Sequence, residues 1–254
     1  MRLTRVYVDA SLTPGSLVEL PRDTASHLAK VLRARGGEEL ILFNGDGREF
    51  NGAIEAVRGS RVSASVGDGR PVDRESPLRI TLVQSVPRGD RMDFIVQKAT
   101  ELGVARIVPV LSQRSVVRLD RAQAESKAAH WRGVAVSACE QCGRTRLPAI
   151  DPAQPLLNYL GECAPAIGPR WVFEPESSPQ AQLDAPNPPM TEMAIGPEGG
   201  FTPDELEAFR VAGFSQVSLG PRILRTETAA IAAMVWLQAR FGDLSIAMDI
   251  EDRD

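Results

Sequence analysis

The stretch Ile195-Gly-Pro-Glu-Gly-Gly-Phe-Thr-Pro-Asp-Glu205 is the most informative part of this chain, together with a second stretch, Leu219-Gly-Pro-Arg-Ile-Leu-Arg-Thr-Glu-Thr-Ala229. Each follows a short apolar segment and leads into a sequence with helical character. Glycines adopt positive φ and let a ligand approach bare backbone, which side chains would otherwise block. Two such turns close together therefore predict two walls of one pocket for a small polar molecule. A tight strand-to-helix connection would explain either turn alone.

The overall composition is that of a globular protein. The chain has 254 residues, which suits one large domain or two modest ones, and its hydrophobic content is 43%. No apolar run approaches the ~20 residues of a membrane span, and the N-terminus lacks the apolar stretch of a signal peptide. We therefore expect a cytoplasmic protein without a membrane partner. Its three cysteines do not suggest a disulfide framework.

Charge is unevenly distributed along the chain. The net charge is −4, but residues 74–150 carry thirteen Lys and Arg against seven Asp and Glu, whereas residues 151–254 carry six against sixteen. The acidic average thus hides a basic middle segment. A polyanion responds to the local field, so this segment is compatible with RNA binding, although it could equally be a solvated surface.

The N-terminal part has the pattern of a small β-rich module. Alternating apolar residues predict strands over residues 39–43, 49–57 and 61–66, and the spacing of Leu28, Val31 and Leu32 predicts one helix over residues 26–33. Glycines, Pro71 and charged residues over 67–77 indicate a linker.

After residue 77 the pattern becomes α/β. A strand over residues 78–86, a helix over 92–102 and a strand over 105–111 form a βαβ unit, which predicts a parallel sheet. A long helix is expected over residues 120–142. Short buried strands are expected over residues 170–174, 192–195 and 216–219, and a loose surface loop over 175–189.

Two helix starts carry specific signals. Thr202-Pro-Asp-Glu205 matches a capping box with Pro at the first helical position. Thr226 is predicted to cap a last helix over residues 227–241. That helix is apolar nearly all round, so it is either fully buried or a contact between subunits, and we favour the contact.

Conventional catalytic and metal-binding patterns are missing. His27 and His130 are the only histidines and neither has a recognisable partner, and no nucleotide fingerprint of the GxGxxG or GxxxxGK[ST] type occurs. Cys139 and Cys142 form a CxxC without suitably spaced further ligands and at the end of a helix, so we expect neither a metal site nor a redox pair. Arg144 and Arg146 just beyond could instead clamp phosphates, or satisfy the last carbonyls of the helix.

Taken together, these segments resemble the 16S ribosomal RNA uridine-N3 methyltransferase family (RsmE) of the SPOUT superfamily. The resemblance runs from the N-terminus to about Phe241 and leaves out the tail after Gly242 and the 175–189 loop. The two glycine turns are its specific part. It rests on Ser26–Arg33, Lys98–Gly103, Gln113–Val117 and Glu140–Arg144, and on the turns Ile195–Thr202 and Leu219–Ala229.

The resemblance implies an architecture and a cofactor. Residues 1–72 would form a PUA-like RNA-binding β-barrel, residues 73–244 a SPOUT α/β domain with a parallel sheet and a C-terminal trefoil knot, and residues 245–254 an acidic tail. The protein would be a homodimer through the SPOUT domain. S-adenosyl-L-methionine would bind in the knot, at Phe173, Glu174, Gly196, Pro197, Gly199, Gly200, Leu219, Gly220, Ile223, Leu224, Arg225 and Thr228.

The resemblance also implies methylation of uridine N3 in 16S rRNA, within the 30S subunit. Attack by N3 needs a flipped-out base and stabilisation of the charge that develops on it. Candidates for this chemistry are Arg225, Glu198, Arg144 and Glu140. Candidates for RNA contact are Arg5, His27, Lys30, Arg33, Arg114, Arg118, Arg144 and Arg146. Two alternatives stay open: methylation of another RNA, at a ribose 2′-hydroxyl or a tRNA base, and a non-enzymatic assembly factor.

Overall fold

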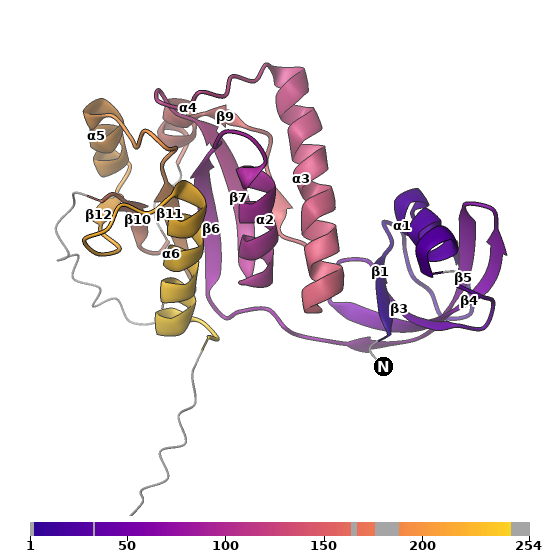
Figure 1. Cartoon of the computed structure of the whole chain (residues 1–254). Coiled ribbons are helices and arrows are strands. Elements are labelled where there is room, and N and C mark those ends of the chain that lie inside the picture. The colour runs from indigo at the N-terminus through magenta and orange to yellow at the C-terminus, as the bar shows by residue number, and fades with distance from the viewer. Residues whose placement is uncertain (1–2, 33, 164–166, 176–187, 245–254) are drawn as a thin grey trace, which may run out of the picture. The chain divides into compact units, whose positions relative to one another are not determined.

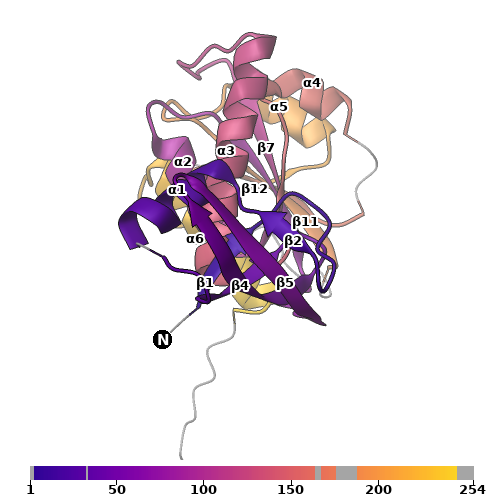
Figure 2. The ribbon, with the colours of Figure 1, turned by 90° about the vertical axis from the view of Figure 1, so that its right-hand side faces the viewer.

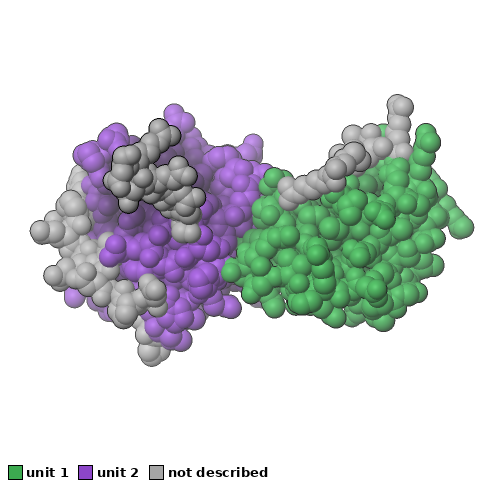
Figure 3. All heavy atoms as spheres, turned by 90° about the horizontal axis from the view of Figure 1, so that it is seen from below, with its two compact units in different colours: residues 1–75, 136–147 green, residues 76–135, 148–254 purple. Residues whose placement is uncertain are grey.

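The protein is described by a computed structural model that covers residues 3–32, 34–163, 167–175 and 188–244, without the side chains of His27, Val31 and Leu32. The chain folds into two compact units (Figure 3). Unit 1 comprises residues 1–75 and 136–147, and unit 2 comprises residues 76–135 and 148–254. The end of the long helix is thus grouped with the N-terminal part, whereas a division at residue 72 would assign it to the C-terminal domain.

Unit 1 is built on a five-stranded sheet with the order β1-β3-β4-β5-β2. Strand β1 pairs with β3 in parallel and the other pairs are antiparallel. Alternate apolar residues such as Leu40, Leu42 and Val62 face one buried core. The strands are β1 (Thr4–Tyr7), β2 (Leu17–Glu19), β3 (Glu39–Phe43), β4 (Arg48–Arg58) and β5 (Arg61–Pro71), of which β4 and β5 are long neighbours in Figure 2.

Two expectations for unit 1 are wrong in detail. The helical segment begins earlier than predicted, because α1 (Arg22–His27) follows Pro21 directly and continues as a π-helical turn, η1 (Leu28–Leu32). The expected linker starts too early, because β5 runs on to Pro71 and pairs Gly69 with Phe50. A Cβ on Gly69 would lie 2.5 Å from the Phe50 ring, so the missing side chain makes room for that ring.

Unit 2 contains the predicted parallel sheet, with the order β12-β10-β11-β6-β7-β8 and with β9 also pairing with β7. All of these pairs are parallel. The strands are β6 (Arg79–Ser85), β7 (Val104–Leu111), β8 (Ala149–Ile150), β9 (Gln154–Pro155), β10 (Arg170–Phe173), β11 (Met190–Ile195) and β12 (Ser215–Val217). The helices are α2 (Arg91–Glu101), α3 (Arg121–Cys142), α4 (Leu156–Gly161), α5 (Pro203–Val211) and α6 (Thr226–Phe241).

Helices cover both faces of this sheet, which explains why its strands are apolar on both sides. Leu82 faces a core shared with α2, α6 and the first part of α3, whereas the next residue, Val83, faces a core shared with α4 and α5. Met193 and Ala194 divide in the same way. Strand β6 ends where α2 and α6 begin (Figure 1), so the carboxyl ends of the strands and two helix starts meet at one edge of the sheet.

The predicted capping box of α5 is confirmed. The Thr202 hydroxyl accepts a hydrogen bond from the Glu205 N–H at 3.3 Å, and the Glu205 carboxylate accepts one from the Thr202 N–H at 2.9 Å. The second oxygen of Glu205 accepts a hydrogen bond from the Gln113 N–H at 2.7 Å. One buried carboxylate therefore fixes the start of α5 and the loop after β7. Among the described residues, no helix is long and apolar enough to span a membrane.

We expect Gly69→Ala to destabilise unit 1, because the new methyl group collides with the Phe50 ring. The cost should be about 1–3 kcal/mol, as in other overpacked cores. Native-state hydrogen exchange of β4 and β5 amides measures it. Gly133→Ala in α3 is the matched control: no atom lies within 4 Å of its Cβ, so it should be neutral or stabilising by up to ~1 kcal/mol. Equal protection in both variants would contradict this account of β5.

Candidate functional site

A pocket of about 370 Å³ lies in unit 2 at the carboxyl ends of β10 and β11 and the start of α6. This edge is where open parallel sheets usually bind ligands. Four chain segments build it: the ends of β10 and β11, the start of α2 and the turn that leads into α6. Its lining residues are Arg91, Phe173, Glu174, Pro175, Ile195, Gly196, Pro197, Glu198, Gly200, Ile223, Leu224, Arg225, Thr226 and Ala229.

The first glycine turn needs its glycines for shape. Gly200 has φ +67 and its N–H donates to the Pro197 carbonyl at 2.9 Å, which closes the turn. A Cβ on Gly196 would lie 3.3 Å from the Gly200 Cα and 3.5 Å from the Phe201 ring. The turn therefore presents backbone to the pocket, as its sequence predicts.

Thr226 joins this turn to the rest of the pocket. Its hydroxyl donates to the Gly196 carbonyl at 2.7 Å and accepts a hydrogen bond from the Gln84 side-chain amide at 3.0 Å. The prediction that Thr226 caps α6 is wrong: the cap position belongs to Arg225, and Thr226 is the first helical residue. Because its hydroxyl is used by Gly196 and Gln84, it connects the end of β6, the first turn and α6.

Arg91 connects the two glycine turns by charge. Its guanidinium forms an ion pair with Glu198 in the first turn, and its Nε lies 3.8 Å from a Glu227 oxygen in the first turn of α6. Glu198 also accepts a hydrogen bond from the Arg88 N–H at 3.1 Å. Partial burial works to raise the pKa of Glu198, but the backbone hydrogen bonds and the charge of Arg91 outweigh it and hold that pKa below its ordinary value. Glu198 is thus a fixed anion at neutral pH.

Many of the predicted cofactor residues are brought together by the fold. Phe173, Glu174, Gly196, Pro197, Gly200, Ile223, Leu224 and Arg225 line the pocket, as does the predicted catalytic residue Glu198. Gly199, Leu219, Gly220 and Thr228 are not among the lining residues. The Gly199 carbonyl instead accepts a hydrogen bond from Arg114 at 2.9 Å.

Sequence reasoning missed Arg91, Pro175, Ile195 and Ala229 as lining residues. Arg91 is the most informative of these, and a signal for it exists. It lies directly after the loop that follows β6, and in a parallel sheet such loops open onto the ligand-binding edge. Thr226 lies within the quoted second turn, but its predicted role as a helix cap hid its contact with Gly196.

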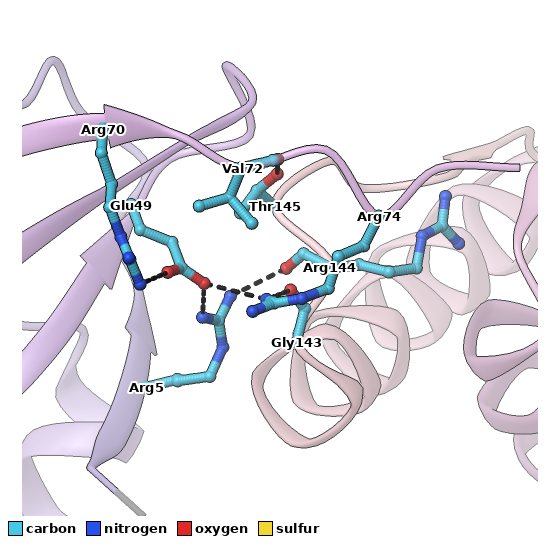
Figure 4. Close-up of polar contacts among 8 residues, drawn as sticks. All are labelled: Arg5, Glu49, Arg70, Val72, Arg74, Gly143, Arg144 and Thr145. Atoms are coloured by element: carbon cyan, nitrogen blue, oxygen red, sulfur yellow. Dashed lines mark hydrogen bonds and ion pairs between the residues drawn. The ribbon is translucent and has the colours of Figure 1, made fainter.

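Two of the predicted RNA-contacting arginines are buried in unit 1. Arg5 is 8% exposed and forms an ion pair with Glu49, and Arg144 is 4% exposed and donates to Glu75 from Nε at 3.0 Å. Figure 4 shows the guanidinium groups of Arg5, Arg70 and Arg74 converging on Glu49. The distances to Glu49 are 3.2 Å from Arg70 and 3.0 Å from Arg74.

This cluster fastens the end of α3 to the sheet of unit 1. The Arg5 guanidinium donates to the Arg144 carbonyl at 3.1 Å, and the Thr145 hydroxyl donates to the Val72 carbonyl at 2.9 Å. Removing one partner of such a buried ion pair is costly, because it leaves the other charge buried and unpaired. The structure thus gives Arg5 and Arg144 an internal structural role, which accounts for them without RNA.

Glu140, proposed for catalysis, also belongs to unit 1. Its carboxylate accepts a hydrogen bond from the Tyr7 N–H at 3.0 Å. Burial raises the pKa of Glu140, against the opposing effects of the Tyr7 hydrogen bond and the charge of Arg5. The hydrogen-bond partner that the structure gives Glu140 is therefore the backbone of β1 in unit 1.

The remaining predicted RNA contacts differ in exposure. Arg114 and Arg118 are exposed, but their guanidinium groups donate to backbone carbonyls of the loop after β7 and of the first glycine turn. Lys30 and Arg146 are exposed in unit 1. Arg33 and the side chain of His27 lie outside the described residues.

Cys139 of the CxxC pair is held in its thiol form. Cys139 is buried, and its hydrogen bond with Cys142 and its burial raise its pKa far above the ordinary value. Within the described parts of the chain, no group of three or more His, Cys, Asp or Glu residues is placed to hold a metal ion.

Comparison with known proteins defines the class of the two parts of the chain. Residues 74–238 match the family model of an RNA methyltransferase domain, and residues 20–66 match that of an RNA methyltransferase PUA domain. The fold and site therefore belong to an RNA methyltransferase with an N-terminal PUA domain. This confirms the predicted α/β fold with a parallel sheet and the PUA-like character of the N-terminal part.

The relatives narrow the class to one family. A protein from Buchnera aphidicola (Schizaphis graminum), named ribosomal RNA small subunit methyltransferase E, is 32% identical over 96% of this chain and 99% of its own length. The enzyme of that name from Neisseria gonorrhoeae, solved with S-adenosylmethionine, is 37% identical over 96% of this chain and 100% of that chain, with a TM-score of 0.86. A methyltransferase from Legionella pneumophila, also solved with this cofactor, is 40% identical over the same shares, with a TM-score of 0.89. The chain belongs to the ribosomal RNA small subunit methyltransferase E family, as its sequence motifs suggested.

We expect Glu49→Gln to destabilise the protein by about 3 kcal/mol at pH 7, because it leaves buried arginine charge without its anion. Burial alone would raise the pKa of Glu49, but Arg5 and then Arg74 outweigh it and lower that pKa. The stabilisation is therefore complete above the ordinary glutamate pKa and is lost as the pH falls through the lowered folded value. Urea unfolding at pH 7 and pH 3 measures this: the difference in unfolding free energy between the variant and the wild type should be smaller at pH 3 than at pH 7.

Glu19→Gln is the matched control for the Glu49 variant. The Glu19 side chain is 65% exposed and 3.9 Å from Arg61, so its loss should change the unfolding free energy by less than about 0.5 kcal/mol at either pH. A Glu49→Gln variant that behaves like this control would show that the network of Figure 4 contributes no stability.

Proposed function

We propose that this protein methylates N3 of a specific uridine in 16S rRNA, using S-adenosyl-L-methionine. The observation that carries this proposal is the pocket of unit 2, formed by both glycine turns in a chain of this family. Support comes from relatives named as small subunit rRNA methyltransferases and from two similar structures that hold the cofactor.

The pocket fits this cofactor in size and character. Its volume of about 370 Å³ is within the range of roughly 300–1,000 Å³ typical of small-molecule sites. Phe173, Ile195 and Leu224 offer apolar walls for a flat base, and Glu174 and the backbone of residues 196–200 offer polar groups. We assign cofactor binding to the eight predicted residues that line the pocket and add Thr226.

When bound, the cofactor would supply an electrophilic methyl group to uridine N3, with the electron pair of its carbon–sulfur bond staying on sulfur, and the N3 proton would pass to the Glu198 carboxylate. The chain's contribution is positioning and charge. Arg225 is exposed at the pocket and can stabilise negative charge on the uracil oxygens. Glu198 is an anion beside the pocket and can accept the hydrogen bond of N3–H. Arg144 and Glu140, which have partners within unit 1, are not carried into this proposal as catalytic groups.

For RNA contact, exposed lysine and arginine side chains are better candidates than the buried Arg5 and Arg144. We retain Lys30, Arg114, Arg118 and Arg146 and add Arg70 and Arg74, whose side chains are 69% and 46% exposed. Arg70 and Arg74 both contact Glu49, yet the cluster they share with Arg5 keeps excess positive charge, which attracts phosphates. Arg5 is left out because its guanidinium is buried. A 30S subunit in the cytoplasm is the proposed setting.

We further propose a homodimer through unit 2 and a trefoil knot at its C-terminal end. Helix α6 exposes Val235 by 41%, and Ile231 and Ala232 on neighbouring turns are only partly buried. Ile223 lines the pocket and is 85% exposed. A second copy that covers this apolar surface would shield both the helix and the pocket rim.

The function is tested by incubating the protein with 30S subunits that lack the modification and with labelled cofactor. We expect methylation of one uridine at N3, mapped by mass spectrometry. Methylation of a ribose or of tRNA would identify another RNA substrate, and cofactor binding without any methylation would favour an assembly factor.

Thr226→Val removes the hydroxyl that fixes the Gly196 carbonyl, and should weaken cofactor binding about 10-fold in calorimetry.

Val235→Glu should convert the proposed dimer to a monomer, because it places a charge in an apolar interface. Sedimentation or light scattering measures the mass. Val211→Glu in α5 is the matched control, since Val211 is 74% exposed and lies on another helix. A Val235→Glu variant that stays dimeric would place the interface elsewhere.

A further inference from the structure

A second hollow, of about 510 Å³, lies directly beside the cofactor pocket. It is lined by Arg88, Gly89, Asp90, Arg91 and Glu198, and it shares Arg91 and Glu198 with the cofactor pocket. The Arg91–Glu198 ion pair is therefore a common wall of the two spaces. Any group seated against this pair in the hollow would lie directly beside the proposed cofactor pocket.

The loop of residues 88–90 forms one side of the hollow and leaves free space around Gly89. Gly89 has φ +65 and has no atom within 4 Å of a Cβ position. The Arg88 N–H donates to Glu198, which holds this loop against the first glycine turn. The Arg88 side chain is exposed, and the structure gives its guanidinium no partner among the described residues. Arg88 is thus a cation at the rim that is available to a phosphate.

We propose that this hollow receives the flipped-out target uracil, with the Arg91–Glu198 pair binding its Watson–Crick edge and Arg88 an adjacent phosphate. The proposal rests on the proposed function. The edge of uracil presents an N3–H donor between two carbonyl acceptors, and Glu198 and Arg91 present an acceptor beside a donor. The pair therefore matches N3–H and one neighbouring oxygen, and RNA bases are commonly read on this edge.

The same arrangement suits the reaction. As N3 gives its proton to the Glu198 carboxylate, negative charge spreads to the uracil oxygens, and the Arg91 guanidinium lies where it can stabilise that charge. Glu227 lies on the other side of Arg91, and its Oε2 is buried without a hydrogen-bond partner among the described residues. Two carboxylates, one from each turn, thus lie beside the Arg91 guanidinium and favour its position at the shared wall.

Asp90→Trp tests the hollow without altering the cofactor pocket, because Asp90 lines only the hollow and its side chain makes no cap hydrogen bond. We expect cofactor affinity within about 2-fold of wild type by calorimetry. Methylation of 30S subunits should fall at least about 10-fold in kcat/KM. A variant that methylates as wild type, or one that loses cofactor binding in proportion, would overturn the proposal. A folded variant is confirmed by its thermal midpoint.

Arg88→Ala gives an independent readout in the salt dependence of RNA binding. Loss of one phosphate contact should lower the slope of log Kd against log salt by about 0.7–0.9. Arg79→Ala is the matched control: Arg79 is exposed and starts β6, at the opposite end of the strand from the hollow. It should not change kcat/KM, and equal slopes for both variants would remove Arg88 from the site.

Glu198→Gln tests the proposed hydrogen bond between uracil N3–H and the Glu198 carboxylate. The glutamine side chain has the same size as glutamate, but its amide NH₂ is a donor that can face the N3–H donor. We expect a lower kcat and little change in cofactor affinity.

A 4-thiouridine at the target position should photo-crosslink within residues 88–91, and a crosslink confined to other segments would contradict the proposal. Failure of the wild type to methylate 30S subunits would refute the proposed function itself, whereas an active wild type with unaffected variants refutes only this site.

Discussion

The buried hydrogen bonds of Thr226 hold the pocket together. One hydroxyl joins the Gly196 carbonyl of the first glycine turn to the Gln84 amide at the end of β6, and it does so from the first residue of α6. Each of these groups is buried, so a missing partner would cost more than the bond itself contributes. The relative position of the two turns is therefore tied to the central strand of the sheet, and both the pocket and its charged wall depend on it.

Charge is used differently in the two units. In unit 1, Glu49 and Glu75 neutralise buried arginines and fasten the end of α3, which is a structural use of ion pairs (Figure 4). In unit 2, Arg91 is placed between Glu198 and Glu227 at the edge of a pocket, where its side chain is 39% exposed. The number of arginines in the sequence does not distinguish structural ion pairs from ion pairs at a pocket. The difference depends on which carboxylates the fold brings close to each arginine.

Local patterns in the sequence predicted much of the fold. The helix expected over residues 120–142 is observed as Arg121–Cys142, and the capping box at Thr202 is observed with both of its hydrogen bonds. Such features depend on neighbours within a few residues. The strand β5 was predicted too short because its last residues read as a linker, and only the partner ring of Phe50 explains why glycine belongs there. Arg5 and Arg144 were expected at the surface because their carboxylate partners lie far away in sequence.

By itself, the sequence determined the α/β class, the two glycine turns as parts of one pocket, and the family. These follow from residue types at short spacing, where glycine conformation and strand periodicity leave few choices. The tertiary structure alone decided that Arg91 links the two turns, that Thr226 fastens them rather than capping a helix, and that the end of α3 is grouped with unit 1. The reason is physical: pairing of buried polar groups depends on distance in space, and residues 84, 196 and 226 become neighbours only when the parallel strands are assembled.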